Sequence, residues 1–416
     1  MPENQELSPP ELPTLEKPRA ANVVFVESAM RLREGIAEYS QLEGPIGVDA
    51  ERASGFKYSN RAYLIQLFRR GGSILLIDPI AVSADDPKVF EELATLLDNA
   101  EWVLHAASQD IPCLSELGLR PKLLFDTELA ARLANLDRVG LGSSCESLLG
   151  LKLAKEHSAV DWSIRPLRDD WLNYAALDVD VLIDLRDALE ELLASQGKTE
   201  WAKQEFIHAT KFSPKAPNPD KWRAMTGLSA VKDLQILAVA RELWNAREEL
   251  AIKLDVSPGR LVPDASLVEA ATSKHQNRAA LAANRKFAGR ASRSYLDTWW
   301  AAVERGQSTR DLPSLRVANP GIPNHRSWPQ KYPEADARLK VARSALTELA
   351  EELNVPIENL ISPDTVRQVC WQPSGQREEA IREQLSSLGA RTWQIDAIAA
   401  TLITAVSSTA LTSSQD

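Results

Sequence analysis

Three short segments of the sequence place acidic side chains where they could act together. GVDAE supplies Asp49 and Glu51, and residues two apart in a β-strand point to the same side of the sheet. LHAASQDIPCL places Asp110 near the start of an expected helix. In NYAALDVDVL, Tyr174 and Asp178 are four residues apart, which puts a phenol and a carboxylate on one helix face. Together the motifs suggest a single acidic site.

Such a site would suit hard divalent cations. Neighbouring carboxylates repel each other, and a divalent cation relieves that repulsion because hard cations prefer oxygen ligands. Two divalent ions roughly 3.5–4 Å apart can clamp the attacking and leaving oxygens of an in-line phosphoryl displacement. Tyr174 lies one helical turn before Asp178, where it could orient the attacking water. The sequence therefore predicts metal-assisted phosphoryl chemistry.

The acidic residues also have interpretations that need no metal. D-x-E at a strand end can be a solvated edge, and Asp110 in a first helical turn would favour the helix dipole as a cap. Asp178 has poor helix propensity and could instead form a salt bridge with Arg165 or Arg168. Asp180 lies on another face of the same helix, and we expect it to meet solvent. Spacing alone leaves these alternatives open.

Residues 21–210 predict a mixed α/β domain that would hold these side chains. GPIGVDAE, RAYLIQLF and SILLIDPI predict three strands, and the turn RRGGS makes the last two a hairpin. EWVLHAA predicts a further strand, and KLLFDTELAARLAN predicts a strand followed by a helix with Asp126 or Thr127 at its N-cap. Alternating helices and strands after the first three strands indicate a mixed sheet flanked by helices.

Helical periodicity dominates beyond a linker predicted by the prolines and lysines of KFSPKAPNPDKW. LAVARELWNAREELAIKLDVSPGRLVPD (237–264) resembles LKVARSALTELAEELNVPIENLISPD (339–364), which indicates two helical modules. The expected divisions of the chain are a disordered tail at 1–20, the α/β domain at 21–210, a helical module at 217–305, a Pro- and Arg-rich connector at 306–334, and a second helical module at 335–410.

Composition predicts a soluble protein of two or three domains, with 416 residues, 44% hydrophobic and 25% charged. No apolar run reaches the roughly 18 residues of a spanning helix, so no membrane partner is expected. The proline-rich start has no apolar run and predicts a mobile tail rather than a signal peptide. Three cysteines without metal-ligand spacing argue against a disulfide framework and fit the cytoplasm.

Charge is distributed unevenly along the chain. The net charge is -10, but residues 271–345 hold 14 Lys and Arg against 5 Asp and Glu. This basic belt could bind phosphates, or it could be a solvated helical face. Arg285, Lys286, Arg290 and Arg293 are its best candidates for contacts with a nucleic-acid backbone.

The order of the motifs resembles a known family. D-x-E, then H-x4-D, then Y-x3-D resembles the DEDD exonuclease superfamily in its tyrosine subclass. YLIQLF, LLIDP, LHAASQDIPCL, LFDTELAARL, Lys155, DWSIRPL and NYAALDVDVL, in this order, resemble ribonuclease D, and the helical modules resemble the HRDC domains of that family. Two features depart from it: D-A-E stands where D-T-E is usual, and RASGFKYSNRAY (52–63) is more basic than in many members.

This resemblance implies an α/β plus all-α chain: an RNase H-like mixed-sheet exonuclease domain followed by two helical HRDC-like domains. The implied activity is that of a 3′-5′ exoribonuclease. By motif, Asp49, Glu51 and Asp178 would hold one metal ion, and Asp49 would also touch a second ion with Asp110 near it. Tyr174 would position the nucleophilic water, and the expected ions are Mg²⁺ or Mn²⁺.

The expected partner is RNA with a single-stranded 3′ end, such as a tRNA precursor. Lys155 and Arg165 are further candidates for RNA contacts, although an exposed lysine and a packing arginine are the plainer interpretations. One alternative is a 3′-5′ DNA exonuclease on the same scaffold, because the carboxylates act on the phosphate and not on the 2′-OH. Another is a catalytically silent nucleic-acid-binding protein, whose signature would be a missing metal ligand.

Overall fold

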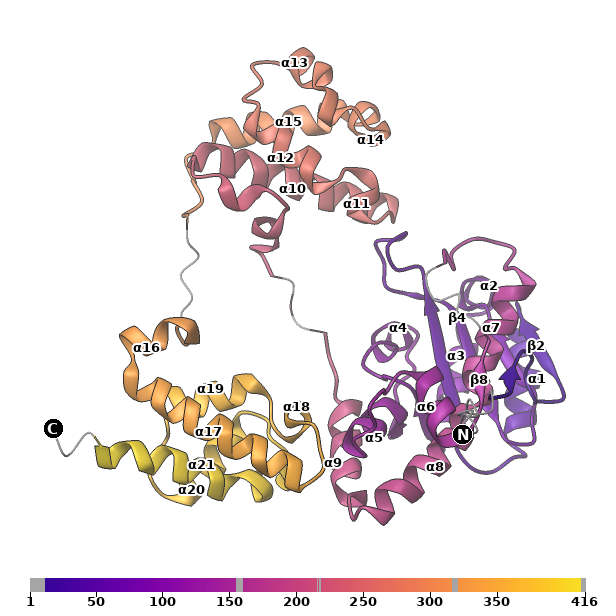
Figure 1. Cartoon of the computed structure of the whole chain (residues 1–416). Coiled ribbons are helices and arrows are strands. Elements are labelled where there is room, and N and C mark those ends of the chain that lie inside the picture. The colour runs from indigo at the N-terminus through magenta and orange to yellow at the C-terminus, as the bar shows by residue number, and fades with distance from the viewer. Residues whose placement is uncertain (1–11, 155–159, 215, 217, 316–320, 413–416) are drawn as a thin grey trace, which may run out of the picture.

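The chain folds into an α/β domain followed by two helical domains (Figure 1). The computed structural model describes residues 12–154, 160–214, 216, 218–315 and 321–412. The α/β domain contains every strand of this described part, and helices account for the regular structure after it. This order agrees with the fold class expected from the sequence.

A six-stranded mixed sheet forms the centre of the α/β domain, in the order β2-β5-β4-β3-β6-β7. The strands are β2 Val23–Val26, β3 Ile46–Arg52, β4 Ala62–Arg69, β5 Ile74–Ile77, β6 Glu101–Leu104 and β7 Leu123–Asp126. β4 pairs antiparallel with both β3 and β5, while β3–β6, β6–β7 and β2–β5 are parallel. The predicted hairpin of RAYLIQLF and SILLIDPI is therefore confirmed as β4 and β5.

Helices cover both faces of the sheet because its central strands alternate between two apolar cores. Leu64 and Phe68 of β4 belong to one core, whereas Ile65 and Leu67 belong to the other. The helices are α1 Ala29–Tyr39, α2 Pro79–Asp85, α3 Val89–Leu97, α4 Ile111–Ser115, α5 Thr127–Leu133, α6 Leu141–Leu149, α7 Asp169–Asp180, α8 Leu182–Ser195 and α9 Thr199–Thr210. α7 packs against β3, β4 and β5, which brings its polar face to the strand carrying D-A-E.

The first helical domain has a hydrophobic core of its own, built around Trp222, Leu243 and Trp299. Its elements are η1 Lys221–Ala224, η2 Leu228–Ala230, α10 Leu234–Leu254, α11 Pro258–Leu261, α12 Asp264–Thr272, α13 Arg278–Ala283, η3 Arg285–Phe287, α14 Arg290–Ser294 and α15 Leu296–Ser308. The long helices α10 and α15 pack together, and the smaller helices surround them.

The second helical domain instead continues one of the cores of the α/β domain. Trp328, Leu346 and Trp393 belong to the same apolar cluster as Phe206 of α9. Its elements are η4 His325–Ser327, α16 Trp328–Lys331, α17 Pro333–Glu352, α18 Ile357–Leu360, α19 Pro363–Trp371, α20 Glu378–Ser387 and α21 Thr392–Thr412. Figure 1 shows α9 lying beside this domain.

The repeat seen in the sequence has a structural counterpart. α10 and α17 are long helices that are each followed by a left-handed residue, Asp255 with φ 48° and Asn354 with φ 50°. The next amides then close the turn in the same way, from Val256 to Ala251 and from Val355 to Ala350. A one-turn helix and a nine-residue helix follow in both copies.

The start of the chain differs from the predicted disordered tail over 1–20. β1 Thr14–Leu15 pairs in parallel with β8 Lys152–Leu153. Arg19 donates to the carboxylate of Asp180 at 2.8 Å and to its carbonyl at 2.8 Å. Asp180 is only 2% exposed, so the expectation that it meets solvent was wrong. Arg19, which lies in the segment predicted to be mobile, offsets the free-energy cost of burying the Asp180 carboxylate.

The predicted connector over 306–334 is also partly folded. α15 extends to Ser308, and η4 and α16 lie at its other end. Trp328 is fully buried against the second helical domain and donates its indole N–H to the carbonyl of Pro323. The high content of Pro and Arg in this segment gave no indication that Trp328 anchors it to the second helical domain.

Candidate active site

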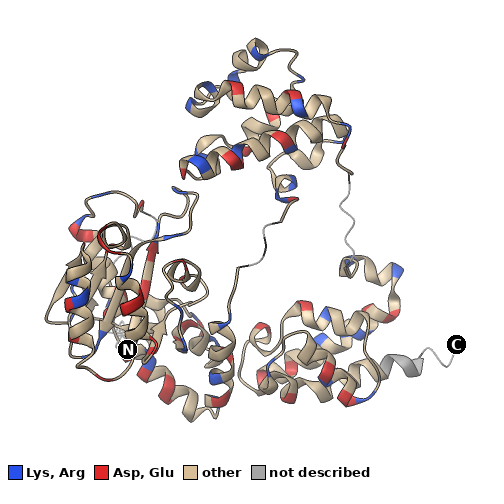
Figure 2. Ribbon diagram, turned by 180° about the vertical axis from the view of Figure 1, so that it is seen from behind, with Lys and Arg blue, Asp and Glu red and all other residues tan. Residues whose placement is uncertain are grey.

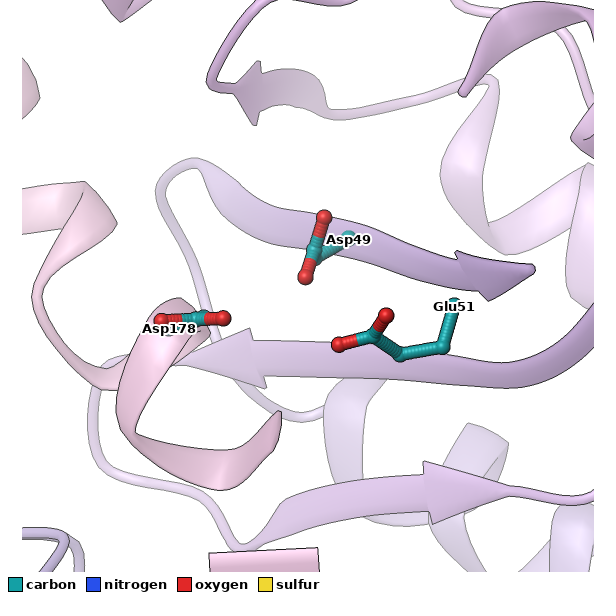
Figure 3. A group of neighbouring side chains, drawn as sticks. All are labelled: Asp49, Glu51 and Asp178. Atoms are coloured by element: carbon teal, nitrogen blue, oxygen red, sulfur yellow. The ribbon is translucent and has the colours of Figure 1, made fainter. Parts of the chain in front are cut away.

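β3 and α7 bring three carboxylates together. Asp49 and Glu51 project from β3 toward Asp178 on α7, as Figure 3 shows. One oxygen of each carboxylate lies within 4.8 Å of the others, a spacing that fits a shared cation. Period-2 alternation along β3 explains why both of its acids face the helix. The predicted convergence of these residues is therefore present.

Asp110 joins this cluster from the loop between β6 and α4. It stands at the N-cap of the five-residue α4, but its side chain makes no capping hydrogen bond. The carboxylate lines the same pocket as Asp49, Glu51 and Asp178, and it is 5% exposed. The alternative that Asp110 is simply a helix cap does not describe this geometry.

Asp126 holds the loop that presents Asp110. It caps α5, as expected, by accepting from the amides of Glu128 and Leu129. It also accepts from the amides of Ala106 and Ala107, at 3.1 and 2.9 Å. The bonds from Ala106 and Ala107 tie the end of β7 to the turn after β6, so the cap is also a support for the acidic site.

Burial and mutual repulsion make the acidic cluster expensive to ionise without a cation. Burial raises the pKa of Asp49 to about 6. Burial, followed by the neighbouring carboxylates, raises the pKa of Glu51 well above its usual range. Asp110 also has a raised pKa, first from burial and then from Asp49. Divalent cations would reverse these shifts, so the donor set fits the expected metals.

Tyr174 extends from the same face of α7 as Asp178. A hydrogen bond joins the two side chains, and burial followed by the Asp178 charge raises the pKa of the phenol. The fully buried Trp162 lies beside the Tyr174 ring, with 6.4 Å between the ring centroids. DWSIRPL therefore packs against the helix that carries the site. Tyr174 stays protonated at neutral pH and can donate a hydrogen bond.

The four carboxylates and Tyr174 line one pocket of about 1210 Å³. Its walls also include His105, which is hydrogen-bonded to Thr127 at 2.9 Å. Burial lowers the pKa of His105 to about 4, so this ring is neutral at physiological pH. The N-terminal part of α6 also lines the pocket. The pocket is larger than a typical small-ligand site and suits an extended substrate.

Arg165 has structural partners. Its guanidinium binds the Asp78 carboxylate at 2.5 Å and the Tyr63 carbonyl at 2.7 Å. Arg168 is paired with Asp170 at 2.8 Å. These pairings support the packing interpretation of Arg165, and they supply both arginines with partners other than Asp178. Lys155 lies outside the described residues.

Sequence reasoning missed two residues at this site. Arg52 follows Glu51 and places a guanidinium nitrogen 3.8 Å from a carboxylate oxygen of Asp110. Gln66 pairs with Asp49 across β3 and β4, and it is fully buried. Neither atom of the Gln66 amide has a hydrogen-bond partner among the described residues. The basic composition of RASGFKYSNRAY was the sequence signal that could have pointed to Arg52. For Gln66, the signal was a glutamine inside an apolar strand.

The basic belt divides into paired and unpaired side chains. Arg285, Arg290 and Arg293 are exposed and form no ion pair with any described residue. Lys286 instead pairs with Glu269 at 3.1 Å. Figure 2 shows basic and acidic residues interspersed along the helices of both helical domains. The three arginines therefore remain candidates for phosphate contacts, while Lys286 is partly neutralised.

Known families match all three domains. Residues 23–194 match a family described as 3′-5′ exonuclease, and residues 236–303 match the HRDC domain. Residues 321–406 match a family described as 3′ to 5′ exonuclease C-terminal domain, rather than a second HRDC domain. The catalytic residues expected from the sequence all lie within the first of these matches.

Curated relatives extend the similarity over most of the chain. Ribonuclease D of Gluconacetobacter diazotrophicus is 31% identical over 321 residues, which cover 76% of this chain and 78% of the relative. The chain belongs to the ribonuclease D family. It is accordingly a 3′-5′ exoribonuclease, a hydrolase of phosphodiesters. Ribonuclease D of Granulibacter bethesdensis is similar at 30% identity, covering 73% of this chain and 75% of the relative.

Two solved structures share the fold over most of the chain. A protein from Bifidobacterium adolescentis superposes with a TM-score of 0.86 at 35% identity, covering 95% of this chain and all of that one. RNase D of Escherichia coli shares the fold with a TM-score of 0.64 at 23% identity, over 88% of this chain and 99% of that one. Within the described residues, no helix has the length and apolarity needed to cross a membrane.

Proposed function

We propose that this ribonuclease D family member removes nucleotides from the 3′ end of RNA by a two-metal mechanism. The observation that carries the proposal is the convergence of Asp49, Glu51, Asp110 and Asp178 with Tyr174 in one pocket. Membership in the family gives the exonuclease class, and the donor set supports the metal requirement. No acidic position of the motif is missing, which argues against a silent binding protein.

The residues fit two hard divalent ions, Mg²⁺ or Mn²⁺. Asp49, Glu51 and Asp178 would hold one ion, and Asp49 with Asp110 would hold the second. When bound, the ions would stabilise the charge on the attacking and leaving oxygens of the phosphodiester. The raised pKa of Asp49, to about 6 through burial, supports this assignment because an isolated acidic cluster would resist full ionisation.

Tyr174 would orient the attacking water. Its pKa is raised by burial and by Asp178, so the neutral phenol acts through hydrogen bonds and does not remove the proton. Asp178 accepts from Tyr174 and fixes the ring on the pocket side of α7. Trp162, packed beside the ring, limits its movement. These contacts would favour a single water position in line with the scissile bond.

The proposed substrate is RNA with a single-stranded 3′ end, with tRNA precursors as the expected natural class. Exposed Arg285, Arg290 and Arg293 of the first helical domain would contact the body of the RNA while its end enters the acidic pocket. All three cysteines are free and buried, which supports the proposed cytoplasmic setting.

The test is digestion of a 5′-labelled RNA that carries a single-stranded 3′ overhang, beside a DNA of the same sequence. We expect a ladder shortening from the 3′ end with Mg²⁺ or Mn²⁺, no products with EDTA, and little cleavage of DNA. Equal cleavage of DNA would replace the RNA assignment by a general 3′-5′ exonuclease. Absence of cleavage of both strands with either ion would overturn the proposed activity.

A further inference from the structure

The basic segment RASGFKYSNRAY follows directly after the catalytic strand, and its first residue reaches the acidic pocket. Arg52 is the only lysine or arginine among the described residues that line this pocket. Its side chain is 26% exposed, so it has access both to the carboxylates and to the open pocket. The positive charge of Arg52 would compete with divalent cations for the same carboxylates, so its place in the pocket needs an explanation.

Arg52 reaches the pocket through a local irregularity. Strict alternation would point it to the face of the sheet opposite Glu51. The register between β3 and β4 shifts between Glu51 and Arg52, an irregularity of the kind that re-aims side chains at strand ends. The guanidinium consequently lies 3.8 Å from Asp110, beyond hydrogen-bond distance but within a strong electrostatic contact.

Charge balance indicates what Arg52 does when metals are present. Glu128 and Glu146 at the pocket edge already pair with Arg132 and Arg138. Two divalent ions would neutralise the four remaining carboxylates, and they would remove the attraction that holds Arg52 beside Asp110. The guanidinium would then be an uncompensated cation facing an anionic RNA backbone, for which its planar donors are well suited.

The first helical domain secures the loop that follows Arg52. In this β3–β4 loop (residues 53–61), Arg260 donates to the Gly55 carbonyl at 2.7 Å, and its guanidinium lies 3.9 Å from the centroid of the Phe56 ring. Asp255 accepts from the Ser59 amide at 2.8 Å. The loop is therefore clamped by another domain within a few residues of Arg52.

We propose that Arg52 binds a backbone phosphate of the RNA 3′ end at the acidic pocket, and that docking of the first helical domain on the β3–β4 loop holds it there. The inference rests on the proposed function, because it assumes that the RNA 3′ end enters this pocket. It assigns a substrate contact to Arg52 and a positioning role to Asp255 and Arg260.

The first experiment compares Arg52→Ala and Arg52→Lys with wild type, and uses Arg33→Ala as the matched control. Arg33 lies on α1 and forms exposed ion pairs with Asp86 and Glu92. At RNA concentrations below KM and saturating Mg²⁺, Arg52→Ala should slow cleavage about tenfold to a hundredfold, the range for losing a hydrogen bond to a charged group. Arg52→Lys should retain part of the rate, and Arg33→Ala should match wild type.

Two binding measurements separate a phosphate contact from a structural role. With Ca²⁺ in place of Mg²⁺, short single-stranded RNA should bind Arg52→Ala more weakly, and the slope of log affinity against log salt should flatten by about 0.7. Mn²⁺ affinity, measured by calorimetry without RNA, should be unchanged or higher because a competing cation is gone. Weaker Mn²⁺ binding with full rescue of the rate by added Mn²⁺ would overturn the proposal, as would wild-type rate and RNA affinity.

The second experiment tests the docking. Asp255→Ala/Arg260→Ala should slow cleavage in the wild-type background and change little in the Arg52→Ala background, since both variants act through one guanidinium. Asp364→Ala/Arg367→Ala removes an ion pair between an exposed aspartate and a half-buried arginine of the second helical domain, and is the matched control. Equal effects in both backgrounds would overturn the docking role. Wild-type protein inactive on RNA would instead refute the proposed function, and the Ca²⁺ binding slope would still test Arg52.

Discussion

The two helical domains use the same turn to touch the α/β domain, yet they are attached in different ways. Asp255 after α10 accepts from Ser59, in the loop next to the acidic pocket. The side-chain oxygen of Asn354, after α17, accepts from the side-chain Nδ2 of Asn135 at 2.7 Å, and the Asn354 backbone carbonyl accepts from Lys198 at 2.6 Å. A left-handed residue at the end of a long helix is thus the contact point in both copies.

What surrounds the turn differs strongly. The second helical domain shares an apolar core with the α/β domain, and Trp393 stacks on Trp201 with ring centroids 4.5 Å apart. Glu205 reinforces this contact by accepting from Arg391 and from the Trp393 indole, both at 2.7 Å. The first helical domain keeps a separate core and meets the β3–β4 loop mainly through polar and cation–π contacts.

This difference indicates that the two helical domains are held to the α/β domain with different strengths. Burial of large apolar side chains fixes the second helical domain to the α/β domain, so the two should unfold as a unit. Polar contacts that water can replace hold the first helical domain, so it should open at lower cost. The first helical domain contacts the loop beside the acidic pocket, whereas the second packs beside α9 and shares a core with the α/β domain.

The largest effect is expected from Trp393→Ala. Removing this 4% exposed ring should destabilise the α/β domain by about 3–5 kcal/mol, because a shared core loses a large side chain. Urea unfolding followed by signals from the α/β domain measures the change. Trp299→Ala, in the separate core, is the control and should leave that transition in place. A Trp393→Ala variant with an unchanged transition would contradict a shared core.

Bound metal should stabilise only the unit formed by the α/β domain and the second helical domain. At a hundred times its dissociation constant, Mg²⁺ or Mn²⁺ should add about 2.7 kcal/mol to its unfolding free energy and leave the first helical domain unaffected. Burial raises the pKa of Asp49 to about 6, above its unfolded value, so the metal-free fold loses stability as pH rises toward 6. At one fixed metal concentration, the gain should therefore grow from pH 5 to pH 7, because Asp49 must lose its proton to bind the ion. Calorimetric scans check this, and a gain that is flat or falls with pH would refute it.

A smaller effect is expected from Asp255→Ala. The Ser59 amide loses its acceptor, and a hydrogen bond to a charged group is worth about 1.5–3 kcal/mol. Hydrogen exchange should accelerate through the β3–β4 loop while global unfolding changes little. Asn354→Ala is the matched control at the equivalent turn. It should not change the rate of hydrogen exchange in the β3–β4 loop. Unaltered protection of the loop in Asp255→Ala would mean that the first helical domain does not hold it.

The smallest effect is expected from the exposed arginines of the first helical domain. Replacing Arg285, Arg290 and Arg293 with alanine should weaken RNA binding and flatten its salt dependence by about 0.7 for each arginine that binds a phosphate in the wild-type protein. Lys286→Ala should change the slope less, because Lys286 already pairs with Glu269. If the salt dependence of RNA binding in the triple variant equals that of the wild type, these arginines do not bind phosphates and belong to a solvated face.

Local patterns predicted which acidic side chains lie together, because short-range geometry positions them. Strand alternation brought Asp49 and Glu51 to one face, and helical spacing did the same for Tyr174 and Asp178. Spacing did not decide whether Asp110 caps a helix or faces the pocket. That required the three-dimensional path of the loop, which has no periodic signal in the sequence.

Long-range contacts account for what sequence reasoning missed. Nothing near Asp180 indicated Arg19, which lies 161 residues away in a proline-rich segment. Sequence patterns made no prediction for Arg52, whose place in the pocket accompanies a register shift between β3 and β4 at that residue. The stack of Trp201 on Trp393 likewise joins distant elements, and composition gave no sign of it.

The most direct test of the account compares wild type with Asp178→Asn on the 5′-labelled RNA, using the same samples for RNA binding in Ca²⁺. The substitution keeps the size of the side chain and removes the charge that a divalent ion needs. The account predicts that Asp178→Asn binds RNA with affinity close to wild type and yields no shortened products at any Mg²⁺ or Mn²⁺ concentration. Cleavage at the wild-type rate in this variant would contradict the acidic pocket as the site of hydrolysis.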